Sequence, residues 1–284
     1  MGRVANRQNR VFELKRLTLC EPFVFCYNEK MSWAANRRFL ILLIIGAVIV
    51  AFLTIVLITT VYKTPSCTDG IQNQDETGVD CGGSCQYLCT AEVQPPTVLF
   101  TKILDNDSGR TDIIALIENK NADVAAKNVP YRITLYGDNQ LFIQEINGTV
   151  DLPPGATIPI YLTGVTSGEQ KIKSAFLDIS ASAPRWFSLP SSSRIMPTVL
   201  HTSQNDSATF PRVETILANP SSAPMSNVQA IVLVYDARKD VIAASKTIVS
   251  LIPPRGQATA VFTWNNAFVG IPVSIEVVPI IPLP

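Results

Sequence analysis

An uninterrupted apolar stretch covers residues 39–62, with the sequence FLILLIIGAVIVAFLTIVLITTVY. It contains no charged residue and no proline, and its only polar side chains are threonines and the final tyrosine. At a rise of about 1.5 Å per residue it would form a helix of roughly 36 Å, enough to cross a hydrocarbon core of about 30 Å. A cleaved signal peptide has a shorter apolar region, of about 7 to 15 residues, and a small-residue cleavage site that TTVYKTPSC does not offer. We therefore predict an uncleaved signal anchor, a transmembrane helix in the lipid bilayer.

From residue 97 onward the apolar positions follow a different period. Runs of Val, Ile, Thr and Leu are separated by short polar breaks that carry the prolines, which is typical of β-strands. In the runs around Val129 and Ala156 every second residue is apolar, as in an antiparallel strand with one buried face. We expect strands at residues 98–104, 112–118, 129–136, 141–150, 156–162 and 172–180.

A second set of runs repeats the first at an offset of about 100 residues, the size of one β-sandwich and too long for a solenoid unit. The paired residues are Asn119 with Asn219, Asn128 with Asn227, Tyr136 with Tyr235, and Pro153 and Pro154 with Pro253 and Pro254. We therefore predict an all-β exterior part of two tandem Ig-like antiparallel β-sandwiches, residues 97–188 and 196–284, joined by a linker, residues 189–195. No cysteine follows Cys89, so each core must rest on apolar burial without an inter-sheet disulfide.

The repeated pattern is a strand that ends in Asn, a polar loop, the pair NV, then ITLYGD or IVLVYD, and finally LPPG or IPPRG. It resembles the small bacterial β-sandwich families called FxLYD domains and, more distantly, the WHy domains. Ile133 and Val232 stand where the aromatic residue of the name would be, and Gly137 precedes Asp138. The resemblance implies adhesion, binding or envelope scaffolding instead of catalysis.

Charge is divided unevenly by the apolar stretch. Residues 1–38 hold eight basic and three acidic residues, whereas residues 39–284 hold 15 basic and 20 acidic ones. Arg37 and Arg38 adjoin the stretch, and after Lys63 no basic residue occurs before Lys102. The positive-inside rule therefore predicts a cytoplasmic segment at 1–38 and a periplasmic or extracellular C-terminal part. The acidic exterior argues against nucleic acid as a partner.

Two translation starts remain open, Met1 and Met31, because MSWAANRRFLILL alone would form a short basic leader before an anchor. The first thirty residues carry Cys20 and Cys26, which we interpret as ordinary or acylated cytoplasmic thiols. Their mixture of aromatic and basic residues favours the inner membrane surface, although Pro22 interrupts any single helix there.

Four cysteines lie in the polar stretch CTDGIQNQDETGVDCGGSCQYLC behind the predicted helix: Cys67, Cys81, Cys85 and Cys89. The gaps between them are 13, 3 and 3 residues, which match neither the paired hooks of a structural zinc site nor a C-x-x-C redox pair. On the exported side, oxidising conditions favour disulfides. We predict two disulfides in a juxtamembrane collar, residues 63–96, and all three connectivities remain open.

The acids and amide of this stretch could also supply oxygen ligands to Ca²⁺: Asp69, Asn73, Asp75, Glu76 and Asp80. An EF-hand register that starts at Asp69 would place Gln74 where glycine is needed and Asp80 where a bidentate Glu is usual. This mismatch excludes an EF-hand but leaves an irregular calcium loop open beside the simpler interpretation of solvated acids.

The same stretch resembles a Cys-rich motif of predicted bacterial surface proteins, C-x-DG-x-x-N-x-x-E-TG-x-DCGG-x-C, which follows a membrane anchor or export signal. Every fixed residue of the motif is present between Cys67 and Cys85. The resemblance implies an envelope location and no particular activity.

Candidate chemistry is sparse elsewhere. The chain contains one histidine, His201, for which an exposed strand end is a simpler interpretation than a catalytic base. It contains no phosphate-binding loop, His-based metal cluster or dinucleotide fingerprint. The N-x-S/T triplets at Asn106, Asn147 and Asn205 would be glycosylated in a eukaryote, and we interpret them as bacterial turn residues. We predict no catalytic, cofactor-binding or metal-ligating residue and no cofactor.

These patterns together predict a single-pass protein of the cytoplasmic membrane that is not an enzyme. Its exterior domains would bind a protein of the envelope or cell surface, with exposed edge strands as a ready means. One alternative is an anchored scaffold or spacer of a secretion or pilus-type assembly. A third and less favoured hypothesis is an enzyme with an irregular acidic site. The oligomeric state is open.

Overall fold

The structure is a computed structural model that describes residues 33–61, 66–73, 75–106, 110–168, 170–180, 184–205 and 209–284. The chain divides into two compact units, Met1–Thr64 and Pro65–Pro284. Of the predicted cytoplasmic segment, residues 1–32 with Cys20 and Cys26 lie outside the described residues.

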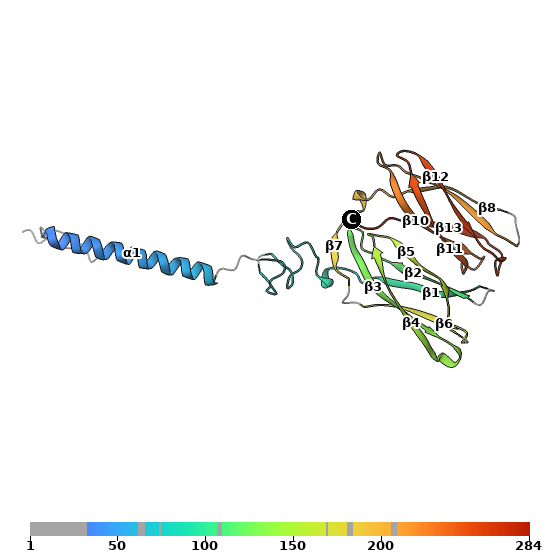
Figure 1. Ribbon diagram of the computed structural model, residues 1–284, viewed down its shortest axis with the longest axis horizontal. Helices are drawn as coiled ribbons and strands as arrows, with labels where there is room; N and C mark the ends of the chain where they lie inside the picture. Colours follow the sequence, from blue (N-terminus) through green and yellow to red (C-terminus); the bar gives the residue numbers. More distant parts are fainter. Residues whose placement is uncertain are drawn as a thin grey trace, which may run out of the picture. The chain divides into compact units, whose positions relative to one another are not determined.

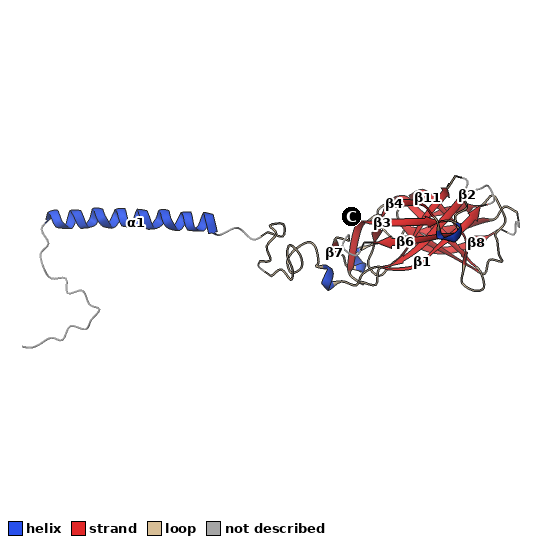
Figure 2. Cartoon of the chain, turned by 90° about the horizontal axis from the view of Figure 1, so that it is seen from below, coloured by secondary structure: helices blue, strands red, loops and turns tan. Residues whose placement is uncertain are grey.

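The first unit contains one long helix, α1 (Trp33–Val61) (Figures 1 and 2). Among the described residues it is the one helix long and apolar enough to cross a membrane. Its threonine hydroxyls donate to carbonyls one turn earlier, for example Thr54 to Val50 and Thr59 to Ile55, both at 3.0 Å. Because these hydroxyls are satisfied within the helix, they add little to the cost of an apolar environment. The predicted single apolar helix is confirmed, and it begins before residue 39 because Trp33–Arg38 continue the helical pattern.

The second unit consists of β-strands in antiparallel sheets, as the sequence predicted (Figure 2). Its first half has one sheet of order β1-β2-β5 and one of order β4-β3-β6, in which β7 also pairs with β3. The strands are β1 (Thr97–Asn106), β2 (Arg110–Glu118), β3 (Val124–Tyr136), β4 (Phe142–Leu152), β5 (Thr157–Val165), β6 (Ser174–Ile179) and β7 (Trp186–Ser188). Each of the six strands expected here is present, and β7 is an additional one.

The second half repeats this arrangement, with sheets of order β12-β9-β8 and β11-β10-β13. The strands are β8 (Thr198–Gln204), β9 (Arg212–Ala218), β10 (Met225–Tyr235), β11 (Val241–Ile252), β12 (Gln257–Thr263) and β13 (Ser274–Ile280). Three short 3-10 helices complete the described elements: η1 (Thr90–Glu92), η2 (Asp138–Gln140) and η3 (Ser191–Ser193). The last of these lies in the segment predicted as a linker.

Each half has an apolar core between its two sheets. In the first half, Ile113, Ala115 and Ile117 of β2 pack with Ile133 and Leu135 of β3. In the second half the corresponding core contains Val213 and Leu217 of β9 and Val228, Ala230 and Val232 of β10. Alternate residues of each central strand thus point into the core of its own half, which gives a β-sandwich arrangement.

A third apolar cluster joins the two halves. Ile114 and Leu116 of β2 contact the same cluster as Ile231 and Leu233 of β10, and Tyr161 of β5 belongs to it. The central strands β2 and β10 are therefore buried on both faces, with one face toward each half's own core and the other toward the neighbouring half.

Asn119 and Asn219, which the repeat pairs, make corresponding hydrogen bonds. The buried amide of Asn119 donates to the carbonyls of Val124 and Leu152, at 2.8 and 3.3 Å, and to that of Pro153 at 2.8 Å. The buried amide of Asn219 donates to the carbonyls of Ala223 and Ile252, at 2.7 and 3.2 Å. Each side chain thus ties the end of one strand to the loop after another and leaves no buried amide unpaired.

Candidate functional site

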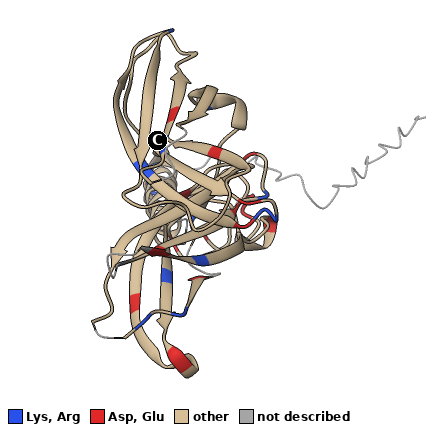
Figure 3. Ribbon diagram, turned by 90° about the vertical axis from the view of Figure 1, so that its right-hand side faces the viewer, with Lys and Arg blue, Asp and Glu red and all other residues tan. Residues whose placement is uncertain are grey.

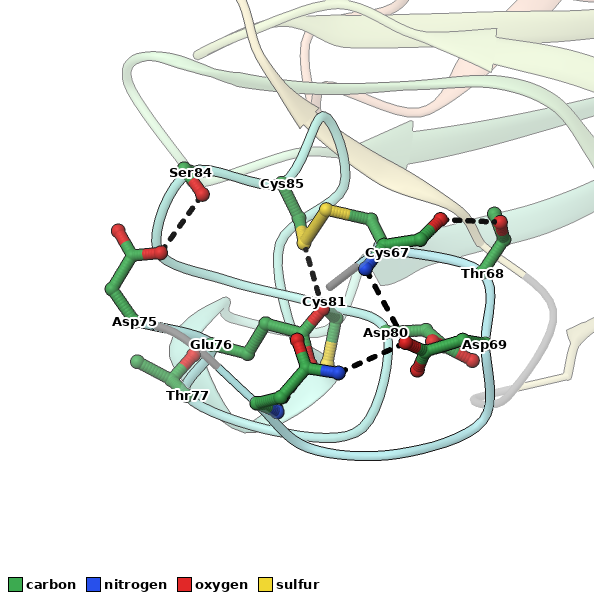
Figure 4. The surroundings of a disulfide bond; sticks show 12 residues. Cys67, Thr68, Asp69, Asp75, Glu76, Thr77, Asp80, Cys81, Ser84 and Cys85 are labelled. Atoms are coloured by element: carbon green, nitrogen blue, oxygen red, sulfur yellow. Dashed lines mark hydrogen bonds between the residues drawn. A yellow bond between two sulfur atoms is a disulfide. The ribbon is translucent and has the colours of Figure 1, made fainter. Parts of the chain in front are cut away.

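The four collar cysteines form two disulfides, Cys67–Cys85 and Cys81–Cys89 (Figure 4). The prediction of two disulfides is confirmed, and the structure selects one of the three connectivities that the sequence left open. The two linked pairs overlap along the chain, because Cys81 lies inside the loop that Cys67–Cys85 closes and Cys89 lies outside it. Such overlapping links restrict the unfolded collar more than two separate small loops would.

The acids at the start of the collar accept hydrogen bonds from neighbouring backbone and amide groups. Both carboxylate oxygens of Asp80 accept the N–H of Gly70, at 3.0 and 3.1 Å. Asp69 accepts the N–H of Ile71 at 3.0 Å and the side-chain amide of Asn73 at 2.9 Å. These carboxylates hold the turn around Gly70 in shape, which gives them a structural role.

The two other acids of the Cys-rich stretch, Asp75 and Glu76, fix its second turn. Glu76 accepts the backbone N–H of Asn73 at 3.2 Å, and Asp75 accepts the hydroxyl of Ser84 at 2.8 Å (Figure 4). Together with Asp69 and Asp80, these residues include all the acids of the Cys-rich motif. The structure therefore gives each of them a bracing contact.

Two glycines of the motif are needed for a close chain crossing. Gly82 has φ +76° and Gly83 has φ +57°, a region that side-chain-bearing residues rarely adopt. A Cβ at Gly82 would collide with the hydroxyl of Thr77, and one at Gly83 would collide with the backbone carbonyl of Asp75. The motif thus encodes the compact crossing that brings Cys81 and Cys85 to their partners.

One group of described residues has metal-ligand atoms within 4.8 Å of one another, namely Cys67, Glu76 and Cys85. Its two sulfurs are joined in a disulfide, and the species that binds metals is the thiolate. A carboxylate oxygen of the buried Glu76 lies 3.2 Å from the sulfur of Cys85. In this oxidised form the group consists of a disulfide with the carboxylate of Glu76 beside it.

The collar is attached to the first half by β7. The N–H of Leu88 donates to the carbonyl of Trp186 at 2.9 Å, and Tyr87 forms a β-bridge with Phe187. The guanidinium of Arg185 lies 4.2 Å from the centre of the Tyr87 ring, in cation–π geometry. Because Leu88 also packs against the first core, the collar is part of the folded body and not a loose tether.

Other residues singled out in the sequence lie apart from one another. His201 is exposed on β8 and pairs with Ile216 of β9. Asn147 is exposed on β4, and Asn205 accepts the N–H of Arg212 at 2.7 Å at a turn. The side chain of Asn106 lies outside the described residues.

A crevice of about 760 Å³ opens between the two halves, at the end of the second unit opposite the collar. Strand β1 runs toward this end (Figure 1). A smaller hollow of about 160 Å³ adjoins it and contains Asp112 and Tyr161. The hydroxyl of Tyr161 donates to Asp112 at 2.7 Å, and the N–H of Gly164 donates to the other carboxylate oxygen at 2.7 Å. Burial, with a smaller effect of the nearby carboxylate, raises the pKa of Tyr161 above its usual range. Sequence reasoning missed this junction.

No protein-family model and no curated protein matches the sequence. Among solved structures, the transglutaminase of red sea bream is similar at 14% identity and a TM-score of 0.23, over 68% of this chain and 32% of its own. This chain therefore spans about a third of that protein's length. A TM-score this low carries no argument about fold or activity.

Proposed function

We propose that the protein is a membrane-anchored, exported binding or structural protein. It presents two tandem Ig-like β-sandwiches, residues 97–188 and 196–284, for protein–protein interaction or adhesion in the cell envelope. The observation that carries the proposal is the order of two features along the chain. The helix α1, which is uncharged from residue 39 to its end, is followed directly by a collar with two disulfides, and disulfides persist in oxidising, exported compartments.

The charge pattern supports the same topology. Arg37 and Arg38 lie within the first turns of α1, and the basic residues of the N-terminal segment favour the cytoplasm. The collar and the β-strands then stand outside the cytoplasmic membrane, in the periplasm or at the cell surface. The resemblance of the collar to the motif of predicted bacterial surface proteins agrees with this placement. In this proposal the protein is not an enzyme.

The shared cluster between the halves favours a second candidate function. The two halves form one packed body instead of two independently moving domains, because their central strands share a buried cluster that contains Ile114, Leu116, Ile231 and Leu233. A packed body suits a spacer in a secretion or pilus-type assembly, where the anchor and the N-terminal segment recruit the machinery.

Cross-linking in cells tests the binding function. A photo-reactive residue is placed at an exposed position of the exterior strands, such as Leu200 of β8, and in a control at Leu42 of α1. A binding protein is expected to form a specific protein adduct from the exterior position. Adducts from the α1 position alone would contradict the proposal. So would an enzyme assay in which the purified protein turns over a defined substrate and loses that activity when one acidic residue is changed.

Removing residues 1–30 separates the two candidate functions. An outward-facing binding protein keeps its exterior adducts after this deletion, because those contacts do not involve the cytoplasm. A spacer recruited by its cytoplasmic segment loses its partners.

A further inference from the structure

The loops at the end of the second unit opposite the collar come from both halves. The strand directions explain this arrangement, because β1 leaves the collar and ends at Asn106, and β10 ends beside it at the loop to β11. Residues 102–105 and 171–173 of the first half and 236–238, 240–242, 269–271 and 273 of the second line the crevice of about 760 Å³. A volume of this size at a junction between packed bodies is typical of ligand sites.

We call this crevice the far-end groove. One of its walls is formed by aliphatic side chains that are exposed to solvent. Val269, Ile271 and Val273 are 85%, 81% and 63% exposed, and they alternate along the segment between β12 and β13. The N–H of Val273 donates to the carbonyl of Tyr235 at 2.8 Å, which fixes this segment at the groove. Large apolar side chains with this exposure, gathered in a hollow, mark an interaction surface.

Every charged side chain but one among the described residues of the groove lining has an ion-pair partner. Lys171 lies 3.6 Å from Asp105, and Arg238 lies 3.4 Å from Asp236 and 3.8 Å from Asp240. Figure 3, which views the unit from this end, shows acidic and basic segments among the loops. Lys173 also lines the groove, and it lies 3.6 Å from Asp138, which does not line it.

Lys102 is the remaining cation. It lies on β1, half-buried, and no carboxylate of the described residues lies within ion-pair distance of its ammonium group. Among the described residues that line the groove, Lys102 is thus the single unmatched positive charge, and it lies beside an aliphatic wall. Its complement is a ligand that places one carboxylate between apolar side chains, because a charge-assisted hydrogen bond is strongest where water is partly excluded.

We propose that the far-end groove binds an extended polypeptide segment of a partner protein, in which aliphatic side chains flank one acidic residue. The aliphatic side chains cover Val269, Ile271 and Val273, and the acidic residue pairs with Lys102. A polypeptide fits better than an anionic membrane, because Asp105, Asp236 and Asp240 line the same groove and repel a uniformly negative surface. The inference deepens the proposed binding function and rests on it.

Two labelled peptides test this assignment by fluorescence polarisation, with the full-length protein in nanodiscs of zwitterionic lipid. The acidic peptide is GSVIEVIGS and its matched partner is GSVIKVIGS, so that only the central charge differs. The acidic peptide is expected to bind about tenfold more tightly, the effect of one charge-assisted contact. Lys102→Glu is expected to reverse this preference, and Ile271→Ser to weaken both peptides.

Lys246→Glu is the matched control, because Lys246 is exposed on β11 outside the groove lining and the charge change is the same. It should leave both affinities unchanged. Equal binding of the two peptides, binding of neither at millimolar concentration, or an unchanged preference in Lys102→Glu would overturn the inference. So would binding that appears only when the nanodiscs or added vesicles contain anionic lipid.

The cross-linking experiment distinguishes failure of the groove assignment from failure of the proposed binding function. If the exterior adduct persists in a Lys102→Glu/Ile271→Ser variant, the protein has a partner but the groove does not hold it. If no exterior position yields an adduct, the proposed binding function itself falls.

Discussion

Truncating Leu233 tests whether the two halves unfold as one body. This side chain is fully buried in the cluster that contains Ile114 and Leu116 of the other half. A buried Leu→Ala change costs about 3 kcal/mol, from lost burial and the cavity that remains. With a urea dependence of about 3 kcal/mol per molar for a body of this size, the midpoint should fall by about 1 M.

Tryptophan fluorescence can follow each half separately. Trp186 is buried in the first core and Trp264 packs against the second, and Trp33→Phe removes the signal of α1. Urea unfolding of Leu233→Ala should move both signals to the same lower midpoint. Ile248→Ala is the control, because Ile248 is 62% exposed on β11 and should change the midpoint little. A shift of the Trp264 signal alone would refute the reasoning, because the halves would then unfold independently.

Three further changes test particular contacts. Gly82→Ala should disturb the collar crossing through its collision with Thr77, so that a non-reducing mass map shows mispaired or free cysteines. Asn219→Ala should lower the free energy of unfolding by about 1 to 3 kcal/mol, because buried carbonyls lose their donor, and this is measured by urea titration. Tyr161 has a folded-state pKa above its unfolded value of about 10. Its contribution to the free energy of unfolding is therefore complete below pH 10 and is lost as pH rises further. Tyr161→Phe should therefore flatten the alkaline fall of the unfolding midpoint, and an unchanged fall would contradict this role.

The sequence predicted the helix and the β-strands because their patterns are local. The apolar run at 39–62 and the alternation around Val129 each depend on neighbouring residues alone. The junction between the halves was missed, although a signal was present. The runs IIALI at 113–117 and AIVLV at 230–234 are apolar at every position, which is typical of strands buried on both faces.

The details of the candidate sites depended on contacts between distant residues. Spacing could not decide which cysteine pairs with which, since the answer rests on the turn at Gly82 and Gly83. The acids of the Cys-rich stretch were candidates for calcium ligands, and the structure shows them as acceptors for nearby backbone and side-chain groups. The groove at Lys102 combines loops more than 160 residues apart, from residue 102 to residue 273, and no local pattern marks it.

Thiol labelling of intact spheroplasts with a membrane-impermeant maleimide tests the central claim of an anchored protein with an exported β part. Ser192→Cys places a thiol on the exposed η3, and Ala34→Cys places one at the exposed start of α1, both in a Cys20→Ser/Cys26→Ser background. The account predicts that Ser192→Cys is labelled before lysis and Ala34→Cys only after it, while the disulfide-linked collar cysteines stay unlabelled. Labelling of Ala34→Cys in intact spheroplasts, with Ser192→Cys protected until lysis, would contradict it.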